Sequence, residues 1–178
     1  MRIIGGKHKG LRLRPPSHLP VRPTTDLAKE ALFNILQNQI DFEGLSVLDL
    51  FAGTGNITLE FASRGASRVL AVDQYGKCAK FVNDTARALD LAGVEAVKAD
   101  AVRFIGRPTE KFGLVFADPP YDWSLLPQLP AMVLQAGLLV PAGLLIVEHP
   151  TTRKLAPHPA WQETRKYGSS SFSFYRQD

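Results

Sequence analysis

The stretch Leu48-Asp49-Leu50-Phe51-Ala52-Gly53-Thr54-Gly55 decides the fold class of this chain. The apolar residues at its start predict a buried strand over residues 46–51, and the two glycines permit a tight turn into a helix over residues 56–64. Further strands are predicted at 68–72, 95–98, 112–117, 143–148 and 170–175, and further helices at 76–91 and 131–136. Nearly all-apolar strands that alternate with helices indicate an α/β fold, with a mostly parallel sheet covered by helices on both faces. A short, proline-rich connection joins the last two strands, so we expect these two to be antiparallel.

Length and composition limit the class of protein. The 178 residues suit one compact domain, and no apolar run approaches the roughly 18 residues that a membrane-spanning helix needs. Cys78 is the only cysteine, which excludes a disulfide framework and fits a reducing compartment. No signal-peptide pattern opens the chain, so we expect a cytoplasmic protein, and a monomer is the default at this length.

The net charge of +4 hides two opposite regions. Residues 1–22 carry +6 and no acid, whereas the remainder, with 15 bases and 17 acids, carries −2. The cations of the first region are Arg2, Lys7, Lys9, Arg12, Arg14 and Arg22. Apolar residues alternate with them around Gly5-Gly6, which favours a hairpin-like arm over a solvated tail. Such a basic arm predicts contact with a polyanion such as RNA, and these six residues are the candidates for it.

A cluster of prolines ends the arm near residue 23 and marks the one expected boundary. Residues 1–23 would form the arm and residues 24–178 the main domain. This domain would begin with an amphipathic helix over residues 26–38, capped by Thr25 or Asp26.

Four successive strands each end near a carboxylate, namely Asp49, Asp73, Asp100 and Asp118. In parallel α/β sheets, ligands bind at the carboxyl ends of the strands, close to the point where the strand order reverses. One such aspartate could be a helix cap or a solvated loop residue. Four at the same edge predict an acidic ligand site.

The glycine loop alone does not identify the ligand. Thr58 stands where a dinucleotide-binding fingerprint has a third small residue, and Asp73, 18 residues beyond Gly55, is placed to accept ribose hydroxyls. Charge separates the alternatives. Asp49 would repel a pyrophosphate, whereas S-adenosylmethionine carries an ammonium and a sulfonium and no phosphate. The acidic edge therefore favours S-adenosylmethionine over a nicotinamide cofactor.

Asp118-Pro119-Pro120-Tyr121 directly follows a predicted strand. A carboxylate and a rigid backbone carbonyl can accept both N–H groups of an exocyclic amine, and the two prolines fix that carbonyl's direction. Catalysis would then rest on positioning and electrostatics. Tyr121 could stack on a base taken out of its helix. The motif therefore indicates methyl transfer to the amine of a nucleobase.

The glycine loop and this tetrapeptide resemble those of class I methyltransferases that act on amino groups. More narrowly, the whole chain resembles the RsmD family of small-subunit ribosomal RNA guanine-N2 methyltransferases. The matching segments are Met1-Arg2-Ile3-Ile4-Gly5-Gly6, Gly10-x-Arg12-Leu13, Arg22-Pro23-Thr24, Glu30-Ala31-Leu32-Phe33-Asn34-Ile35-Leu36, the cofactor loop and Lys166-Tyr167-Gly168. The resemblance implies a Rossmann-like sheet of seven strands with an antiparallel last strand.

The resemblance also implies a role for each site residue. Asp49, Gly53 and Gly55 would hold the methionine part of S-adenosylmethionine, with Phe51 as a further contact. Asp73 and Gln74 would bind its ribose, and Asp100 and Ala101 its adenine. Asp118, Pro119, Pro120 and Tyr121 would hold the target base, which belongs to ribosomal RNA, either free or within the assembled subunit.

Several alternatives stay open. The same tetrapeptide could serve an adenine-N6 methyltransferase on DNA or RNA, and the chain could also be a nicotinamide oxidoreductase or a non-catalytic RNA-binding module. Trp123 could line the base pocket or simply pack. The four histidines lack a metal-ligand spacing, so no metal is expected, and the setting of Cys78 does not indicate a nucleophile.

Overall fold

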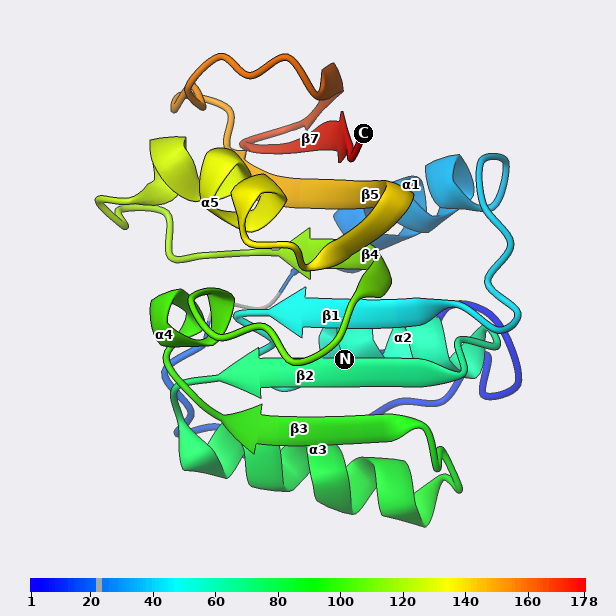
Figure 1. The fold of residues 1–178 in the computed structure, drawn as a ribbon. Coiled ribbons are helices and arrows are strands. Elements are labelled where there is room, and N and C mark those ends of the chain that lie inside the picture. Colours follow the sequence, from blue (N-terminus) through cyan, green and yellow to red (C-terminus); the bar gives the residue numbers. More distant parts are fainter. Residues whose placement is uncertain (22–23) are drawn as a thin grey trace.

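The computed structural model describes residues 1–21 and 24–178, which build a seven-stranded sheet in the order β3-β2-β1-β4-β5-β7-β6 (Figure 1). The strands are β1 (Ser46–Leu50), β2 (Arg68–Asp73), β3 (Val94–Lys98), β4 (Phe112–Ala117), β5 (Leu139–Pro150), β6 (Trp161–Tyr167) and β7 (Ser170–Arg176). β1 to β5 pair in parallel, and β7 is antiparallel to both β5 and β6. The expected α/β class, with a mostly parallel sheet and an antiparallel last strand, is confirmed.

The strand order reverses between β1 and β4, and this switch point positions the ligand site. Leu50 lies in register with Val72 on one side and with Ala117 on the other. The segments that follow β1, β2 and β4 therefore emerge side by side at one edge of the sheet.

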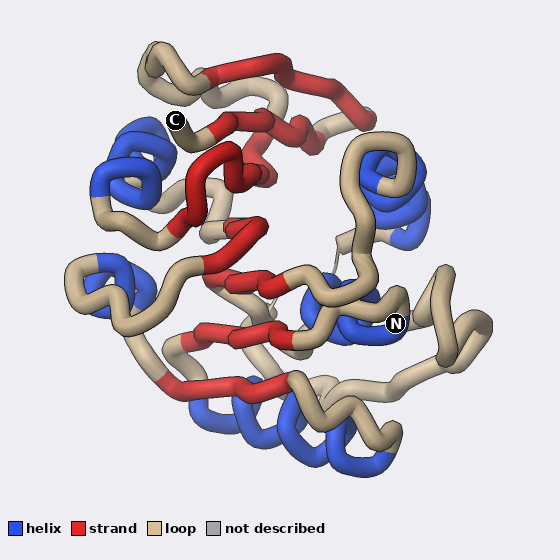
Figure 2. The backbone as a smooth tube through the Cα atoms, turned by 45° about the vertical axis from the view of Figure 1, so that its right-hand side comes forward, coloured by secondary structure: helices blue, strands red, loops and turns tan. Residues whose placement is uncertain are grey.

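Helices cover both faces of the sheet (Figure 2). One face carries α1 (Asp26–Leu36), α2 (Asn56–Ser63) and α3 (Gly76–Ala88), and the other carries α4 (Ala101–Ile105), η1 (Leu126–Gln128) and α5 (Leu129–Gln135). Successive β1 residues alternate between these faces, with Val47 in the core beneath α1 and α2 and Leu48 in the core beneath α4 and α5. None of the helices in the described ranges combines the length and apolar character that a bilayer span requires.

Three elements are absent from the sequence-based prediction. β6 lies within what was expected to be only a connection between the last two strands, and its residues are largely exposed because it is the edge strand. Its sequence, WQETRKY, shows no buried alternation that could have revealed it. α4 and η1, with 5 and 3 residues, are too short to produce a helical periodicity.

Candidate active site

The carboxyl ends of the central strands surround one cavity of about 450 Å³. Its lining includes all four strand-end aspartates, Asp49, Asp73, Asp100 and Asp118. It also includes Phe51, Gly53, Gln74, Ala101, Pro119, Pro120 and Tyr121. Of the residues proposed from sequence for the cofactor and the target base, Gly55 alone is not part of the lining. A cavity of this size suits a small-molecule cofactor together with one base.

Three residues in and beside the glycine loop have backbone conformations that residues other than glycine rarely adopt. Phe51, Gly53 and Gly55 have φ angles of 60°, 56° and 81°, all in the left-handed region. A Cβ on Gly55 would lie 2.7 Å from Cγ2 of Val82 in α3, so this glycine permits close packing of the loop on that helix. Phe51 is not a glycine and carries backbone strain, which is typical of functional loops.

Asp73 ties the loop to the end of β2. One carboxylate oxygen accepts the Gly53 N–H at 2.8 Å, and the other accepts the Tyr75 N–H at 2.9 Å. Each oxygen keeps a further lone pair that can accept a ribose hydroxyl. The side chain therefore shapes the loop and remains able to bind a ligand.

Asp49 lies inside the sheet, in the fourth position of β1, rather than after its end. Only 1% of the residue is exposed, and its carboxylate accepts the Thr58 hydroxyl at 2.6 Å. Burial raises the pKa of Asp49 to about 7, although the bond from Thr58 acts in the opposite direction. Thr58, which breaks the dinucleotide fingerprint, thus serves to hold this carboxylate beside the cavity.

Asp100 is the N-cap of α4 and accepts the Arg103 N–H at 3.1 Å. The helix-cap reading of this residue is therefore correct, and it is compatible with a place in the cavity lining. The cap also fixes the start of α4, which presents Ala101 to the same cavity.

The segment after β4 is held by the start of β7 and by the loop that follows β5. The Tyr121 hydroxyl is hydrogen-bonded to Ser170, which also donates to the buried Glu148 at 3.3 Å. The Arg153 guanidinium donates to the carbonyls of Tyr121 and Trp123, at 2.9 Å each. These contacts fix both the ring and the backbone of the segment that begins with Asp118.

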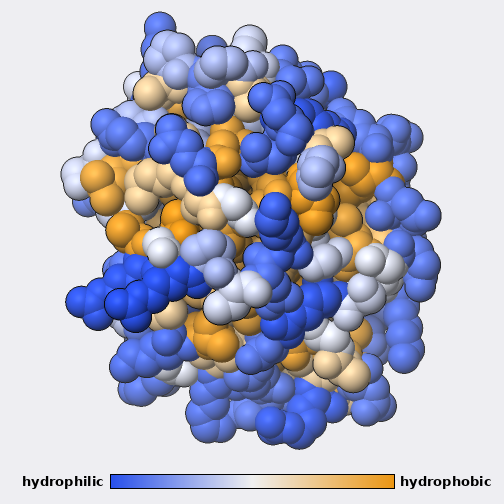
Figure 3. Space-filling model, viewed as in Figure 1, coloured by the Kyte–Doolittle hydropathy of each residue, from blue (hydrophilic) through white to orange (hydrophobic). Residues whose placement is uncertain are grey.

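Trp123 is a wall of the cavity as well as a packing residue. Its ring meets that of Phe51 edge to face, with centroids 5.2 Å apart. Hydrophobic surface gathers over α5 and the segment after β4, at the upper left of Figure 3. Leu125, with 38% of its surface exposed, contributes to this area. The side of the cavity that faces the tetrapeptide is thus apolar and aromatic, as stacking on a base requires.

Sequence reasoning missed several residues of the site. Pro20, Val21 and Thr24, at the end of the arm, line the cavity together with Asn56 at the start of α2. The arm's terminus therefore closes over the glycine loop, which no local pattern indicates. Glu148, in β5, is buried outside the lining and acts on the site through Ser170, which is hydrogen-bonded to Tyr121.

The basic arm folds back on itself and docks on α2. Arg2 and Arg12 form an antiparallel bridge, and Ile3 is fully buried. The side chains of Lys7, Lys9, Arg12 and Arg14 are exposed, while Arg2 forms an ion pair with Asp26 at 3.6 Å. Arg22 lies outside the described residues. The arm is thus a docked hairpin with four exposed cations rather than a solvated tail.

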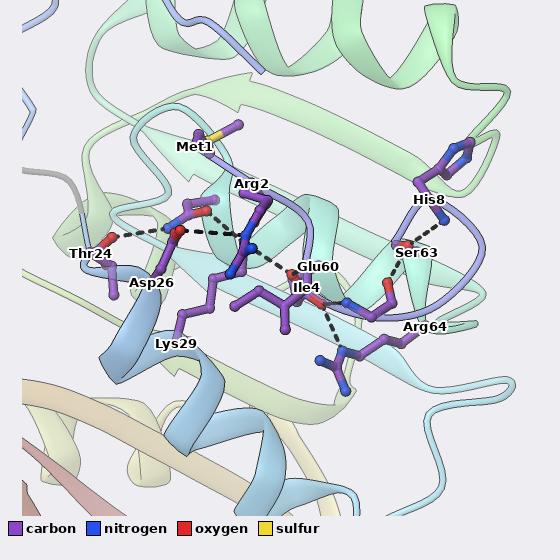
Figure 4. Close-up of polar contacts among 12 residues, drawn as sticks. Met1, Arg2, Ile4, His8, Thr24, Asp26, Lys29, Glu60, Ser63 and Arg64 are labelled. Carbon is purple, nitrogen blue, oxygen red and sulfur yellow. Dashed lines mark hydrogen bonds and ion pairs between the residues drawn. The ribbon is translucent and has the colours of Figure 1, made fainter. Parts of the chain in front are cut away.

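Lys29 is not available to any ligand, since its side chain is completely buried. Its ammonium lies 2.9 Å from Glu60 and donates to the side chain of Asn56 at 2.8 Å (Figure 4). Neighbouring Leu27 is 78% exposed but apolar. Because Lys29 is buried, the first turn of α1 offers no free cation to an anionic partner.

Comparison with known proteins agrees with this geometry. The Ribosomal RNA small subunit methyltransferase D of Escherichia coli (strain K12) is 29% identical over 181 residues, which cover 100% of this chain and 90% of that protein. The solved structure of a hypothetical protein from Thermus thermophilus is 29% identical, covers 98% of each chain and superposes with a TM-score of 0.83.

A more distant structure extends the fold relationship. The Thermus thermophilus 16S rRNA N2 G1207 methyltransferase, in complex with AdoMet and guanosine, superposes with a TM-score of 0.72 at 21% identity. It covers 90% of this chain, which spans 45% of that protein, and it shares the fold of this chain. The family model described as Conserved hypothetical protein 95 matches residues 1–176. The chain therefore belongs to this family, and the RsmD-like resemblance of its sequence is confirmed.

Proposed function

We propose that this protein transfers a methyl group from S-adenosylmethionine to the exocyclic N2 of one guanine in small-subunit ribosomal RNA. One observation carries the proposal: a single cavity joins Asp49, Asp73 and Asp100 to Asp118-Pro119-Pro120-Tyr121. Full-length similarity to proteins named ribosomal RNA small subunit methyltransferase D supports the choice of RNA.

The cofactor side of the cavity fits S-adenosylmethionine by charge and shape. The buried Asp49 carboxylate suits the ammonium of the methionine part, and Asp73 suits the two ribose hydroxyls. Asp100 and the adjoining start of α4 suit the adenine. When bound there, the cofactor supplies a methyl group on a positively charged sulfur. The acidic lining stabilises that charge and would repel a pyrophosphate.

On the opposite side, the chain's task is to position an amine. The nitrogen is a weak nucleophile because its lone pair is delocalised into the ring. Asp118 and the Pro119 carbonyl would accept its two N–H groups and direct the lone pair along the line of attack. Transfer would leave the cofactor as its thioether, and the proton that the amine loses would pass to the Asp118 carboxylate or to water. Tyr121, held by Ser170, and Trp123, held by Arg153, provide aromatic surface for the base.

The replacement Asp118→Ala tests this mechanism, because it separates binding from transfer. We expect methyl transfer to fall at least about 100-fold, as for the loss of a positioned hydrogen-bonding group, with cofactor affinity unchanged. The measurements are calorimetry with S-adenosylmethionine and transfer of a labelled methyl group to small-subunit RNA. Asp122→Ala, one residue beyond the tetrapeptide, is the matched control. Transfer by Asp118→Ala at nearly the wild-type rate would contradict the mechanism.

A further inference from the structure

A buried charge cluster joins the arm to the main domain outside the cavity (Figure 4). It consists of Lys29 from α1, Glu60 from α2 and Arg64, the C-cap of α2. The side chains of Lys29 and Glu60 are completely buried, and Glu60 lies 2.9 Å from Lys29 and 2.8 Å from Arg64. Burial alone would raise the pKa of Glu60, but the charge of Lys29 and the bonds from Ile4 and Arg64 lower it, so the carboxylate stays ionised.

The cluster binds the arm through its backbone. Glu60 accepts the N–H groups of Ile4 and Gly5, at 2.9 Å each, and Lys29 donates to the Arg2 carbonyl at 2.7 Å. Charged groups thus hold three arm residues within the first five. Hydrogen bonds to charged groups contribute about twice as much as neutral ones, so these three bonds attach the arm firmly.

The hairpin turn is fixed at the C-terminal end of α2. Ser63 accepts the His8 N–H through its hydroxyl and the Lys7 N–H through its carbonyl. A Cβ on Gly6 would lie 2.0 Å from that carbonyl oxygen, so the turn rests directly on the helix backbone. At the opposite end, Met1 contacts Thr54 of the glycine loop. The hairpin therefore runs the length of α2, about 12 Å at 1.5 Å per residue, from the cofactor loop to the far end of the helix.

Because the attachment uses backbone groups and buried charges, it leaves four cations of the arm's described residues exposed to solvent. Lys7 and Lys9 are exposed at the turn, and Arg12 and Arg14 are exposed toward the cofactor loop. A disordered arm would lose backbone entropy for each residue that is ordered on binding. A docked arm has already been ordered by folding, which favours tighter binding to a charged partner.

We propose that the Lys29–Glu60–Arg64 cluster positions the arm as a preformed cationic surface for the phosphate backbone of RNA beside the target base. This inference rests on the proposed function, since it names the surface that would bind the same RNA. Lys29, Glu60 and Arg64 act here as positioning residues that do not touch the RNA.

The replacement Glu60→Gln tests the inference because electrostatics and positioning would change RNA affinity in opposite directions. It removes a negative charge, so electrostatics alone would strengthen binding of an anion. It also weakens the hold on Ile4 and Gly5, so positioning would weaken binding. We expect RNA affinity to fall about tenfold, since an arm freed over even a few residues must be reordered at binding. S-adenosylmethionine affinity should stay at the wild-type value.

Three further variants test the positioning role in case Glu60→Gln prevents folding. Ser63→Ala loosens the turn without any change of charge, and Lys29→Arg retains a buried cation that can hold Glu60. We expect Ser63→Ala to weaken RNA binding less than Glu60→Gln, and Lys29→Arg to retain more affinity than Lys29→Met. The matched control is Glu95→Gln, which removes the same charge from an exposed ion pair with Arg68, away from the arm. Glu95→Gln should not weaken RNA binding.

The readouts are RNA affinity by fluorescence anisotropy, cofactor affinity by calorimetry, and amide hydrogen exchange at Ile3, Ile4 and Gly5. Faster exchange at these amides with weaker RNA binding and unchanged cofactor binding is the expected result. If Glu60→Gln and Ser63→Ala both bind RNA as tightly as the wild type, the positioning role is wrong, even if the wild type methylates RNA. If the wild type itself does not methylate ribosomal RNA, the proposed function fails instead.

Discussion

Asp49 shows how one residue combines function with a cost in stability. Its carboxylate lies between β1 and α2, is hydrogen-bonded by Thr58, and has a pKa of about 7. The sequence singles out this residue, since an aspartate in an apolar strand is conspicuous, and the structure places it in the lining of the cavity. It could not reveal the burial, because the depth of Asp49 depends on α2 packing over it through Thr58.

The replacement Asp49→Asn should stabilise the protein at high pH while abolishing cofactor binding. The folded state holds the Asp49 proton up to about pH 7, whereas the unfolded chain releases it near pH 4, so this group lowers stability as pH rises between the two values. At pH 8 we expect a higher melting temperature for Asp49→Asn, with an upper limit of about 4 kcal/mol in the free energy of unfolding. The difference should vanish near pH 4. Thermal melting across this pH range, with calorimetry for the cofactor, checks both parts, and equal melting curves at pH 8 would contradict the account.

The elements divide into those that the sequence predicts and those that it does not. β1, β2 and β4 are short apolar runs bounded by glycine or aspartate, and the predicted ranges agree closely with the observed ones. β6 could not be predicted because an exposed edge strand has no apolar face, and α4 because five residues show no periodicity. The hydrogen bonds from Ser170 and Arg153 to the segment after β4 were also inaccessible, because they join side chains to a segment 30 or more residues away in the chain.

Replacing Arg153 tests whether its hydrogen bonds to the segment after β4 matter for methyl transfer. Replacement by Met removes two hydrogen bonds to the carbonyls of Tyr121 and Trp123 and should let the segment move. We expect transfer to fall about tenfold through kcat, because a loosened near-attack geometry costs rate rather than cofactor affinity. Steady-state kinetics with RNA, together with calorimetry, measures the split.

The control for Arg153 is Arg176→Met, which removes a similar bond to the Ala142 carbonyl near the other end of β5. It should leave the rate unchanged. An Arg153→Met enzyme with normal kcat and weakened cofactor binding would assign Arg153 to the cofactor side instead.

At the scale of the whole molecule, charge is separated in space. The basic arm lies along α2, and the acidic cavity opens at the carboxyl ends of the strands, next to one end of that arm. The sequence predicted both charges and the hairpin, because alternation and glycine turns are local signals. It could not predict that the end of the arm lines the cavity at Pro20, Val21 and Thr24, which is a tertiary contact.

Deleting residues 1–14 would not test the arm's charge, because it would also leave Glu60 without its backbone donors and uncover the buried site of Ile3. Substitution of Lys7, Lys9, Arg12 and Arg14 by Ser is cleaner, since all four side chains are exposed. We expect weaker RNA binding and a salt dependence flatter by up to about 0.7 per lost phosphate contact. Affinity titrations at several salt concentrations measure this slope, and an unchanged slope would exclude these cations from the RNA interface.

The identity of the methylated nucleoside tests the central claim most directly. Unmodified small-subunit ribosomal RNA, free or assembled with its proteins, is incubated with the enzyme and labelled S-adenosylmethionine, digested to nucleosides and analysed by mass spectrometry. The account predicts one N2-methylguanosine per RNA molecule and none with Asp118→Ala. Label in N6-methyladenosine, or no label in RNA from either preparation, would contradict it.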